Sequence, residues 1–303
     1  MSQHIEPLAS KIRPKNIDEY VGQEHLVGIG KPLRLAIENK LIFSFILWGT
    51  PGTGKTTIAR IYADAIKADF FELSAVSAGK DDIRTIIKKT EETEKPVVLF
   101  LDEIHRFNKA QQDFLLPYVE SGKITLIGAT TKAGMLSAPL RDRFGLVHRL
   151  RFYEDDDLQD IVLNAASKLD IIIDSESALE IAKRSRGTAR IALKLLKRVL
   201  DFAQVEHQKS PNPEITKKSL EFYQVDESGL DETDRKLLEA IIKDHDGGPV
   251  GLETLAALVS EDLNTITDIY EPFLMQSGFL ARTPRGRIAT PKAYSHLGLN
   301  PKK

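Results

Sequence analysis

The sequence predicts an α/β domain with a parallel sheet, followed by a helical domain and a winged-helix domain. From about Phe43 to Phe152, short β-rich runs alternate with helical patterns, which is typical of a parallel sheet covered by helices. From about Glu154 to Gln224, apolar residues recur at spacings of three and four, the period of an amphipathic helix. From about Asp231 onward, three helical patterns precede a short basic stretch, which is the element order of a winged helix; the patterns are residues 232–244, 252–260 and 264–278. We therefore expect domains at residues 1–153, 154–226 and 227–303.

Five short runs are the candidate strands of the sheet. The third and fourth are apolar almost throughout, as expected for strands that helices cover on both faces. The runs are residues 43–49, 69–73, 96–103, 124–131 and 147–153. In the second domain, residues 157–169, 177–186 and 189–207 are the candidate helices, and the Ser-Pro-Asn-Pro-Glu segment at 210–214 predicts a loop.

Composition limits the partners and the compartment. The chain has 303 residues, 42% of them hydrophobic, which is enough for two or three cores. Its 42 Lys and Arg residues nearly balance its 44 Asp and Glu residues, so contact with nucleic acid requires a local basic patch. There is no cysteine, which excludes disulfides and favours a reducing compartment. Residues 1–15 contain no apolar signal segment and no apolar run approaches a membrane span, so we expect a soluble, cytoplasmic protein.

A phosphate-binding loop follows the first candidate strand. The segment starting at Gly49 fits the G-x-x-x-x-G-K-[ST] pattern and leads into a helical run. Its glycines let the backbone curl so that N–H groups and a helix N-terminus face the phosphates of ATP or ADP. Lys55 would reach the β- and γ-phosphates, and the Thr56 hydroxyl would ligate Mg²⁺. The expected nucleotide-binding residues are Gly49, Pro51, Gly52, Thr53, Gly54, Lys55, Thr56 and Thr57.

Two adjacent carboxylates end the third candidate strand. Ligands of parallel α/β sheets bind beyond the carboxyl ends of the strands, so Asp102 and Glu103 belong near the phosphate loop. Asp102 would hold Mg²⁺, and Glu103 would orient and polarise the attacking water as general base. The alternative for this pair is a helix cap. His105 is more simply a structural hydrogen-bonding residue, and we assign it no chemistry.

Three further residues are candidate sensors of the phosphate charge. Thr131 closes the fourth run and could hydrogen-bond the attacking water or the γ-phosphate. Arg143 fits an arginine finger, which neutralises charge in the transition state. Arg190 begins a helix of the second domain and could reach the same phosphates. The alternatives are an ordinary strand-end threonine and two solvated surface charges.

A candidate DNA contact lies near the end of the chain. Arg282, Arg285 and Arg287 fall within six residues, and Gly286 permits a tight wing turn between them. Arginines at a wing tip can bind phosphates or enter the minor groove. The alternative is a solvated charged turn.

The ordered motifs resemble those of the AAA+ ATPases. They are the phosphate loop, DEIHR at 102–106, GATT at 128–131, LRDRFG at 140–145 and GTAR at 187–190. From about Thr131 to His296 the chain resembles the RuvB family, the bacterial Holliday-junction branch-migration motors, in segments such as KAGMLSAPLRDRFG and EPFLMQSGFLARTPRGRIAT. The RuvB resemblance implies that Arg143 acts in trans, that Arg190 is the second sensor and that Arg282, Arg285 and Arg287 contact DNA. It also implies that Ile12, Arg13 and Tyr153 frame the adenosine, and that the subunits form a homo-oligomer, expected as a hexameric ring.

From about Leu8 to Thr130 the chain is instead similar to the RarA/MgsA family of replication-associated ATPases. Segments RPKNIDEYVGQEHLVG and LFLDEIHRFNKAQQDFLLPYVESGK carry this resemblance. A typical RuvB has a long β-hairpin before GATT on which its partner RuvA docks, and Ser121–Lys123 leave no room for it. We therefore hypothesise a mosaic joined near Thr125–Thr131, which predicts two kinds of full-length relative, each matching only one half, and no RuvA contact through a hairpin.

The expected function is an ATP-driven motor of the RuvB type on four-way or other branched DNA. The alternatives are a remodeller of replication forks similar to RarA or clamp loaders, and an ATP-binding, DNA-binding protein in which the two activities are weakly coupled. DNA-stimulated turnover separates a motor from a switch, and dependence on RuvA separates the two motors.

Overall fold

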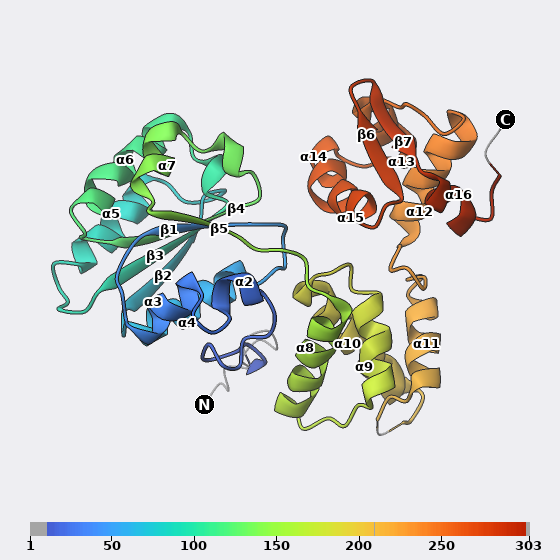
Figure 1. Cartoon of the computed structure of the whole chain (residues 1–303), viewed down its shortest axis with the longest axis horizontal. Helices are drawn as coiled ribbons and strands as arrows, with labels where there is room; N and C mark the ends of the chain where they lie inside the picture. The colour runs from blue at the N-terminus through green and yellow to red at the C-terminus, as the bar shows by residue number, and fades with distance from the viewer. Residues whose placement is uncertain (1–10, 209, 301–303) are drawn as a thin grey trace. The chain divides into compact units, whose positions relative to one another are not determined.

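The computed structural model describes residues 11–208 and 210–300, and the chain divides into two compact units. The first unit contains the described residues up to Ile171 together with Thr188–Arg190, and the second contains Ile172–Gly187 and the described residues from Ile191 onward (Figure 1). Helix α8 (Asp155–Lys168) belongs to the first unit, where the Lys168 ammonium pairs with Glu19 at 2.6 Å. Residues 1–10, which hold most of the segment predicted to lack a secretory signal, lie outside the described residues.

A five-stranded parallel sheet forms the centre of the first unit (Figure 1). Its strands are β1 (Phe45–Trp48), β2 (Asp69–Ser74), β3 (Val97–Asp102), β4 (Thr125–Thr130) and β5 (Leu146–Arg149). Their order is β2-β3-β4-β1-β5, and every neighbouring pair is parallel. The α/β prediction is confirmed, and each of the five predicted runs contains or overlaps one strand. Because all five strands are parallel, the loops after β1, β3 and β4 leave the same edge of the sheet.

Helices cover both faces of this sheet (Figure 1). They are α2 (Glu24–Val27), α3 (Pro32–Glu38), α4 (Lys55–Ala65), α5 (Lys80–Lys89), α6 (Lys109–Glu120) and α7 (Ala138–Arg143), with short turns η1 (Ile104–Arg106) and η2 (Ala133–Met135). Phe45 and Phe100 belong to the core with α3 and α4, whereas Ile46, Leu99 and Leu101 belong to the core with α5, α6 and α7. Alternate residues of one strand therefore enter different cores, which explains the apolar runs.

The second unit contains a helical part and a winged-helix part. The helical part has α9 (Ser175–Lys183), α10 (Ala189–Val205), whose first two residues lie in the first unit, and α11 (Pro213–Phe222). The winged-helix part has α12 (Glu232–Glu239), η3 (Ala240–Asp244), α13 (Leu252–Val259), α14 (Leu263–Thr265), η4 (Ile266–Tyr270), α15 (Glu271–Gln276), β6 (Leu280–Thr283), β7 (Gly286–Ala289) and α16 (Pro291–His296).

The wing is an antiparallel ribbon of β6 and β7. An isolated antiparallel bridge also pairs Val250 with Arg287 of β7. Gly286 is required there, because its φ is 143° and an added Cβ would meet the backbone of Val250. The predicted winged helix is therefore confirmed, with the expected order of helices and ribbon.

Two features of the described residues bear on partners. Residues 121–124 join α6 directly to β4 and contain no strand, in agreement with the prediction that no hairpin precedes GATT. Within the described part of the chain, no helix has the length and apolar character that crossing a membrane requires.

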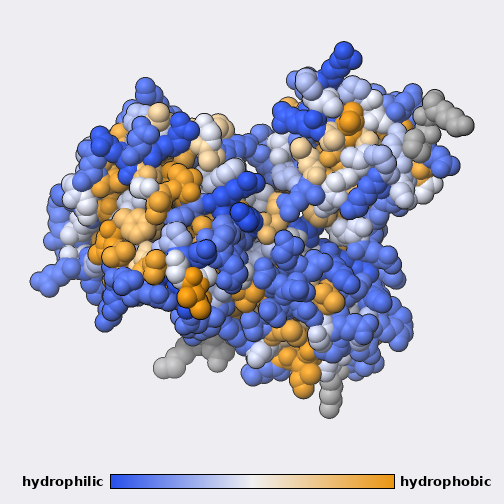
Figure 2. All heavy atoms as spheres, in the orientation of Figure 1, coloured by the Kyte–Doolittle hydropathy of each residue, from blue (hydrophilic) through white to orange (hydrophobic). Residues whose placement is uncertain are grey.

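Figure 2 shows a largely hydrophilic face that apolar patches interrupt.

Candidate nucleotide and DNA sites

The phosphate loop links the end of β1 to the start of α4. Gly54 has a φ of 98°, and an added Cβ would meet the hydroxyl groups of Tyr20 and Tyr153. Gly52 has a φ of 84°, and a Cβ there would lie 2.7 Å from the Cβ of Arg190. Both glycines are thus needed for conformation and for space. The N-terminus of an 11-residue helix follows them, which supplies the positive potential that phosphates prefer.

Lys55 is buried at the first position of α4. Its ammonium donates hydrogen bonds to the carbonyl oxygens of Gly49 and Thr50 at 2.8 and 2.9 Å. Burial lowers the pKa of Lys55 to about 8, although the charges of Asp102 and Glu103 act in the opposite direction. Lys55, Asp102 and Glu103 are therefore close enough to interact through their charges, as the predicted site requires.

A pair of tyrosines lies against the phosphate loop. The hydroxyl oxygens of Tyr20 and Tyr153 are 2.9 Å apart, and Tyr153 donates to the Thr53 carbonyl at 3.1 Å. Burial raises the pKa of Tyr153 to about 12, so its hydroxyl stays protonated. Tyr153 was predicted from the RuvB resemblance, whereas Tyr20 was missed because nothing in its local sequence places it at a loop more than 30 residues away.

The two other residues predicted to frame the adenosine precede α2. Ile12 is buried, and Arg13 is partly buried. Burial lowers the pKa of the Arg13 guanidinium, and the charges of Arg60 and Glu72 act on it. The charges that act on Arg13 thus belong to α4 and β2. The contact of Ile12 and Arg13 with adenosine stays a prediction.

Asp102 and Glu103 stand at the end of β3, as predicted. The Glu103 backbone N–H donates to the Asp102 carboxylate at 3.0 Å, and Glu103 has a left-handed φ of 52°. This conformation is uncommon outside glycine and occurs often at functional sites. Burial and the charge of Asp102 raise the pKa of Glu103, which makes its carboxylate a better proton acceptor.

Thr131 lies beside Glu103, at the end of the neighbouring strand β4. Its hydroxyl donates to the Glu103 carboxylate at 3.3 Å, and its carbonyl accepts a hydrogen bond from the Trp48 indole at 3.2 Å. The loops after β1, β3 and β4 are thereby connected through one threonine. The hydrogen bond from Thr131 to Glu103 was not predicted, because the sequence suggested contact with water or phosphate instead.

Arg190 and Arg143 have different surroundings. The Arg190 N–H donates to the Gly52 carbonyl at 3.4 Å, and the Arg190 charge lowers the pKa of Lys55. Arg190 is therefore near the phosphate loop, as predicted. Arg143 ends α7 with its side chain 56% exposed, and its guanidinium pairs with Glu120 at 2.7 Å. Arg143 is thus exposed at a helix end, and its action in a neighbouring subunit stays a prediction.

The three wing arginines do not share one environment. Arg282 and Arg285 are exposed, whereas the Arg287 side chain is only 9% exposed and its guanidinium pairs with buried Glu271 at 2.5 Å. Burial and this ion pair make Arg287 less accessible to a phosphate than the two exposed arginines are. The structure therefore distinguishes Arg287, held in a buried ion pair, from exposed Arg282 and Arg285, and the DNA contact of each arginine stays a prediction.

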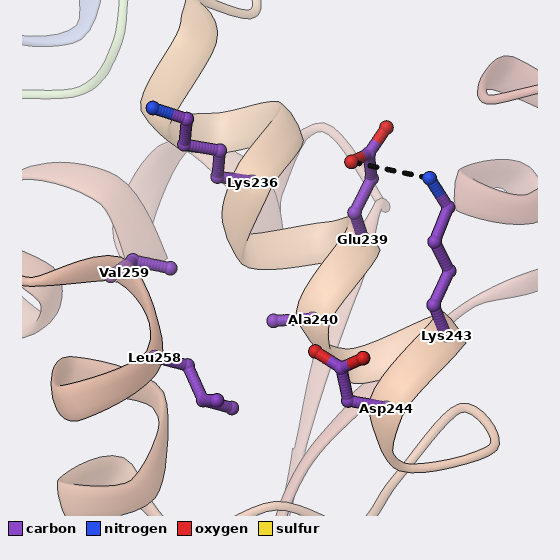
Figure 3. A pocket seen from close by; sticks show the side chains of 7 residues that line it. All are labelled: Lys236, Glu239, Ala240, Lys243, Asp244, Leu258 and Val259. Carbon is purple, nitrogen blue, oxygen red and sulfur yellow. Dashed lines mark ion pairs between the residues drawn. The ribbon is translucent and has the colours of Figure 1, made fainter.

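A pocket lies in the winged-helix part, and both of its lysines are paired with carboxylates. It is lined by Lys236, Glu239, Ala240, Lys243, Asp244, Leu258 and Val259 (Figure 3). Lys243 pairs with Glu239 at 3.3 Å, and Lys236 pairs with Glu232 at 2.7 Å. Because carboxylates already neutralise both lysines, the pocket offers no unpaired cluster of positive charge.

The donor set at the phosphate loop fits Mg²⁺. Asp102 and Thr56 offer oxygen ligands, and Mg²⁺ is usually held by one or two carboxylates together with phosphate oxygens. The described residues contain no group of three or more His, Cys, Asp or Glu residues that could hold a metal alone. A metal here would therefore depend on the nucleotide phosphates for its remaining ligands.

The phosphate loop and the two carboxylates at the ends of parallel strands define an ATPase of the AAA class, to which a winged helix is added. Three family descriptions match consecutive parts of the chain. The AAA ATPase family matches residues 45–152, the RuvB AAA lid domain matches residues 153–226 and the RuvB C-terminal winged helix domain matches residues 227–298. The three-domain prediction agrees with these ranges in order, and its exact boundaries stay a prediction.

The similar proteins are RuvB subunits of Holliday junction branch migration complexes. The one from Synechocystis sp. is 43% identical over 326 residues, covering 99% of this chain and 89% of the relative. The one from Fusobacterium nucleatum is 40% identical, covering 98% of this chain and 95% of the relative. The solved Thermotoga maritima RuvB branch migration motor has a TM-score of 0.87 and 44% identity, covering 96% of this chain and 99% of that chain. This chain belongs to the RuvB family.

The mosaic hypothesis receives no support. It predicted relatives that match only one half of the chain, whereas RuvB proteins match 98 and 99% of it. The first alignment extends over 326 positions, more than the 303 residues of this chain, so this relative has segments that the chain lacks. The short connection before β4 is therefore better explained as a difference within one family.

Proposed function

We propose that this chain is an ATP-driven motor of the RuvB type that moves Holliday junctions and related branched DNA. The observation that carries the proposal is that RuvB proteins match 98 and 99% of this chain, from the phosphate loop to the winged helix. The full-length relatives are themselves subunits of branch migration complexes.

The side chains divide the work at the nucleotide. Lys55 and the N-terminus of α4 bind the phosphates, and Tyr153 and Ile12 bind the adenosine. Thr56 and Asp102 would hold Mg²⁺, which would supply charge neutralisation for the phosphoryl group. Glu103 polarises the attacking water, with Thr131 fixing the orientation of its carboxylate. Arg190 responds to loss of the γ-phosphate.

Assembly and DNA binding complete the motor. Arg143 is exposed and enters the nucleotide site of the next subunit in a ring, for which the family resemblance suggests six copies. Arg282 and Arg285 contact DNA phosphates, and no base-reading arrangement accompanies them. Because residues 121–124 form a short connection, we propose that RuvA is not bound here through a hairpin before β4.

The test measures ATP turnover and branch migration of the purified chain over a range of protein concentrations, with four-way junction DNA, with linear duplex and without DNA. We expect turnover per subunit to rise with both protein concentration and junction DNA. We also expect branch migration to separate the junction into its duplex products. Adding RuvA should change neither rate. Turnover that does not change with protein concentration or DNA would contradict the proposed motor. Strong stimulation by RuvA would contradict the proposal that this chain acts without RuvA.

A further inference from the structure

His105 lies in η1, two residues after Glu103, and is buried. Its side chain is 2% exposed, and its Nδ1 atom is 2.9 Å from the Thr130 hydroxyl and 3.2 Å from the Glu103 carboxylate. Thr130 is fully buried at the end of β4. A single ring nitrogen therefore lies between the candidate general base and the neighbouring strand.

The Thr130 hydroxyl can serve Nδ1 as donor or as acceptor, so the Glu103 carboxylate decides which tautomer of the ring fits best. A carboxylate can only accept a hydrogen bond, so contact between Nδ1 and Glu103 is favourable when Nδ1 carries the hydrogen. The Thr130 oxygen, which also accepts the Lys132 backbone N–H at 2.9 Å, then keeps the ring in place. The ring is thereby fixed to the backbone that follows β4.

Glu103 is held from two directions. Thr131 donates to its Oε2 atom at 3.3 Å, and His105 approaches the same oxygen at 3.2 Å. The Glu103 backbone has a left-handed φ of 52°, so its own conformation does not favour the observed position. The two threonines of GATT thus have different tasks: Thr131 contacts Glu103 directly, and Thr130 acts through His105.

We propose that His105 is a positioning residue for ATP hydrolysis, which with Thr130 holds the Glu103 carboxylate in the direction required to polarise the attacking water. This rests on the proposed role of Glu103 as general base. Misplacement of a catalytic group by about 1 Å can lower a rate by about 100-fold, so a small change in the direction of Glu103 is enough to affect turnover.

The test compares His105→Leu with His105→Asn in the full-length chain, at saturating junction DNA and protein. Asparagine can place an amide N–H near the position of Nδ1, whereas leucine removes the donor and keeps an apolar side chain. For His105→Leu we expect kcat to fall by about 10- to 100-fold with the KM for ATP nearly unchanged. His105→Asn should recover most of kcat. Thr130→Val should lower kcat in the same way, and Thr130→Ser should not.

The outcomes separate a positioning role from a structural one. A wild-type kcat in His105→Leu would overturn the proposal, and so would equal losses in the leucine and asparagine variants. A parallel loss of ATP binding and of thermal stability in His105→Leu, with no recovery by asparagine, would assign His105 to the core alone. Glu103→Gln is measured beside them, because normal turnover in that variant would instead contradict the general-base role.

Discussion

His148 is a buried histidine on β5 whose protonation opposes folding. Its ring meets Phe45 at 5.8 Å, and its Nε2 atom is buried without a hydrogen-bond partner. Burial lowers the pKa of His148 to about 4, below its usual value of about 6.5, and the charge of His25 adds to this. Between those values the unfolded chain binds a proton that the folded chain does not.

The stability of the first unit should therefore fall as pH decreases from about 6.5 to about 4, by at most about 3 kcal/mol from this residue. Urea unfolding at several pH values measures it, with His148→Phe as control because phenylalanine keeps the ring and cannot be protonated. The variant should lose less stability over this window. The same pH dependence in both proteins would contradict a depressed pKa.

The wing arginines should give two different results on substitution. Arg282→Ala and Arg285→Ala should each weaken junction binding and lower the magnitude of the salt slope by about 0.9, because each removes one phosphate contact. Arg287→Ala should instead destabilise the folded chain by about 3–5 kcal/mol, since it leaves buried Glu271 without its partner. Binding titrations over a range of salt and denaturant unfolding measure the two effects. An unchanged salt slope in the exposed variants would contradict the wing contact.

These residues show what a sequence can predict about a site. Lys55, Asp102 and Glu103 were predicted because strand, loop and helix fix where they meet. Arg282 and Arg287 are of one residue type and face each other across the ribbon, so only the position of Glu271 on another element distinguishes them. Tyr20 and the contacts of His105 were missed for the same reason, because their partners are remote in sequence.

At the scale of elements, the segment from Arg186 to Arg190 deserves a test because it passes from one unit to the other. Arg186 is buried in the second unit, where its guanidinium pairs with Asp234 and with Asp231 at 2.6 Å and donates to the Gly229 carbonyl at 2.9 Å. It also lies 5.0 Å from the ring of Phe273. Arg186 thus links the helical part to the winged-helix part.

Arg186→Met should destabilise the second unit by about 3–5 kcal/mol, because Asp234 would remain buried without a counter-charge. Adding Asp234→Leu should recover much of this loss, since it removes the uncompensated charge. Unfolding by denaturant and proteolysis between α11 and α12 measure the effect. Lys218→Met, which removes an exposed pair on α11, is the control and should leave the midpoint unchanged. Equal stability of Arg186→Met and the parent chain would contradict this assignment.

The elements themselves were predicted well where burial leaves a period in the sequence. Strands β3 and β4 are covered on both faces and gave continuous apolar runs, and α10 gave a clear helical spacing. The long pattern at 264–278 was predicted as one helix, but it contains α14, η4 and α15. The π-helical stretch η4 has only five residues, which is too short to leave a period of its own, so the apolar spacing does not show where one helix type changes to another.

At the scale of the whole molecule, the sequence led to the wrong family for the part whose motifs are common to all AAA ATPases. The phosphate loop and the acidic strand end must satisfy the same phosphate and metal chemistry in every AAA ATPase, so likeness in residues 8–130 does not separate families. The helical and winged-helix parts are under different constraints, and they carried the RuvB resemblance correctly. Agreement over 99% of the chain with one relative decided between a mosaic and one family.

The trans position of Arg143 can be tested by mixing two inactive variants. Arg143→Ala subunits keep Glu103 but lack the finger, and should lose about 10³- to 10⁵-fold in turnover while still binding ATP. Glu103→Gln subunits keep the finger but lack the base. In a mixed ring, an Arg143→Ala subunit beside a Glu103→Gln subunit has a complete site, so an equal mixture should restore about one site in four.

Steady-state ATPase of the mixture measures this, and each variant alone is its control. If the mixture is no more active than its components, although light scattering shows mixed assemblies, then Arg143 acts within its own subunit or not at all. Recovery of ATPase activity in the mixture would show that a neighbouring subunit completes each nucleotide site, because no single chain in the mixture has both Glu103 and Arg143.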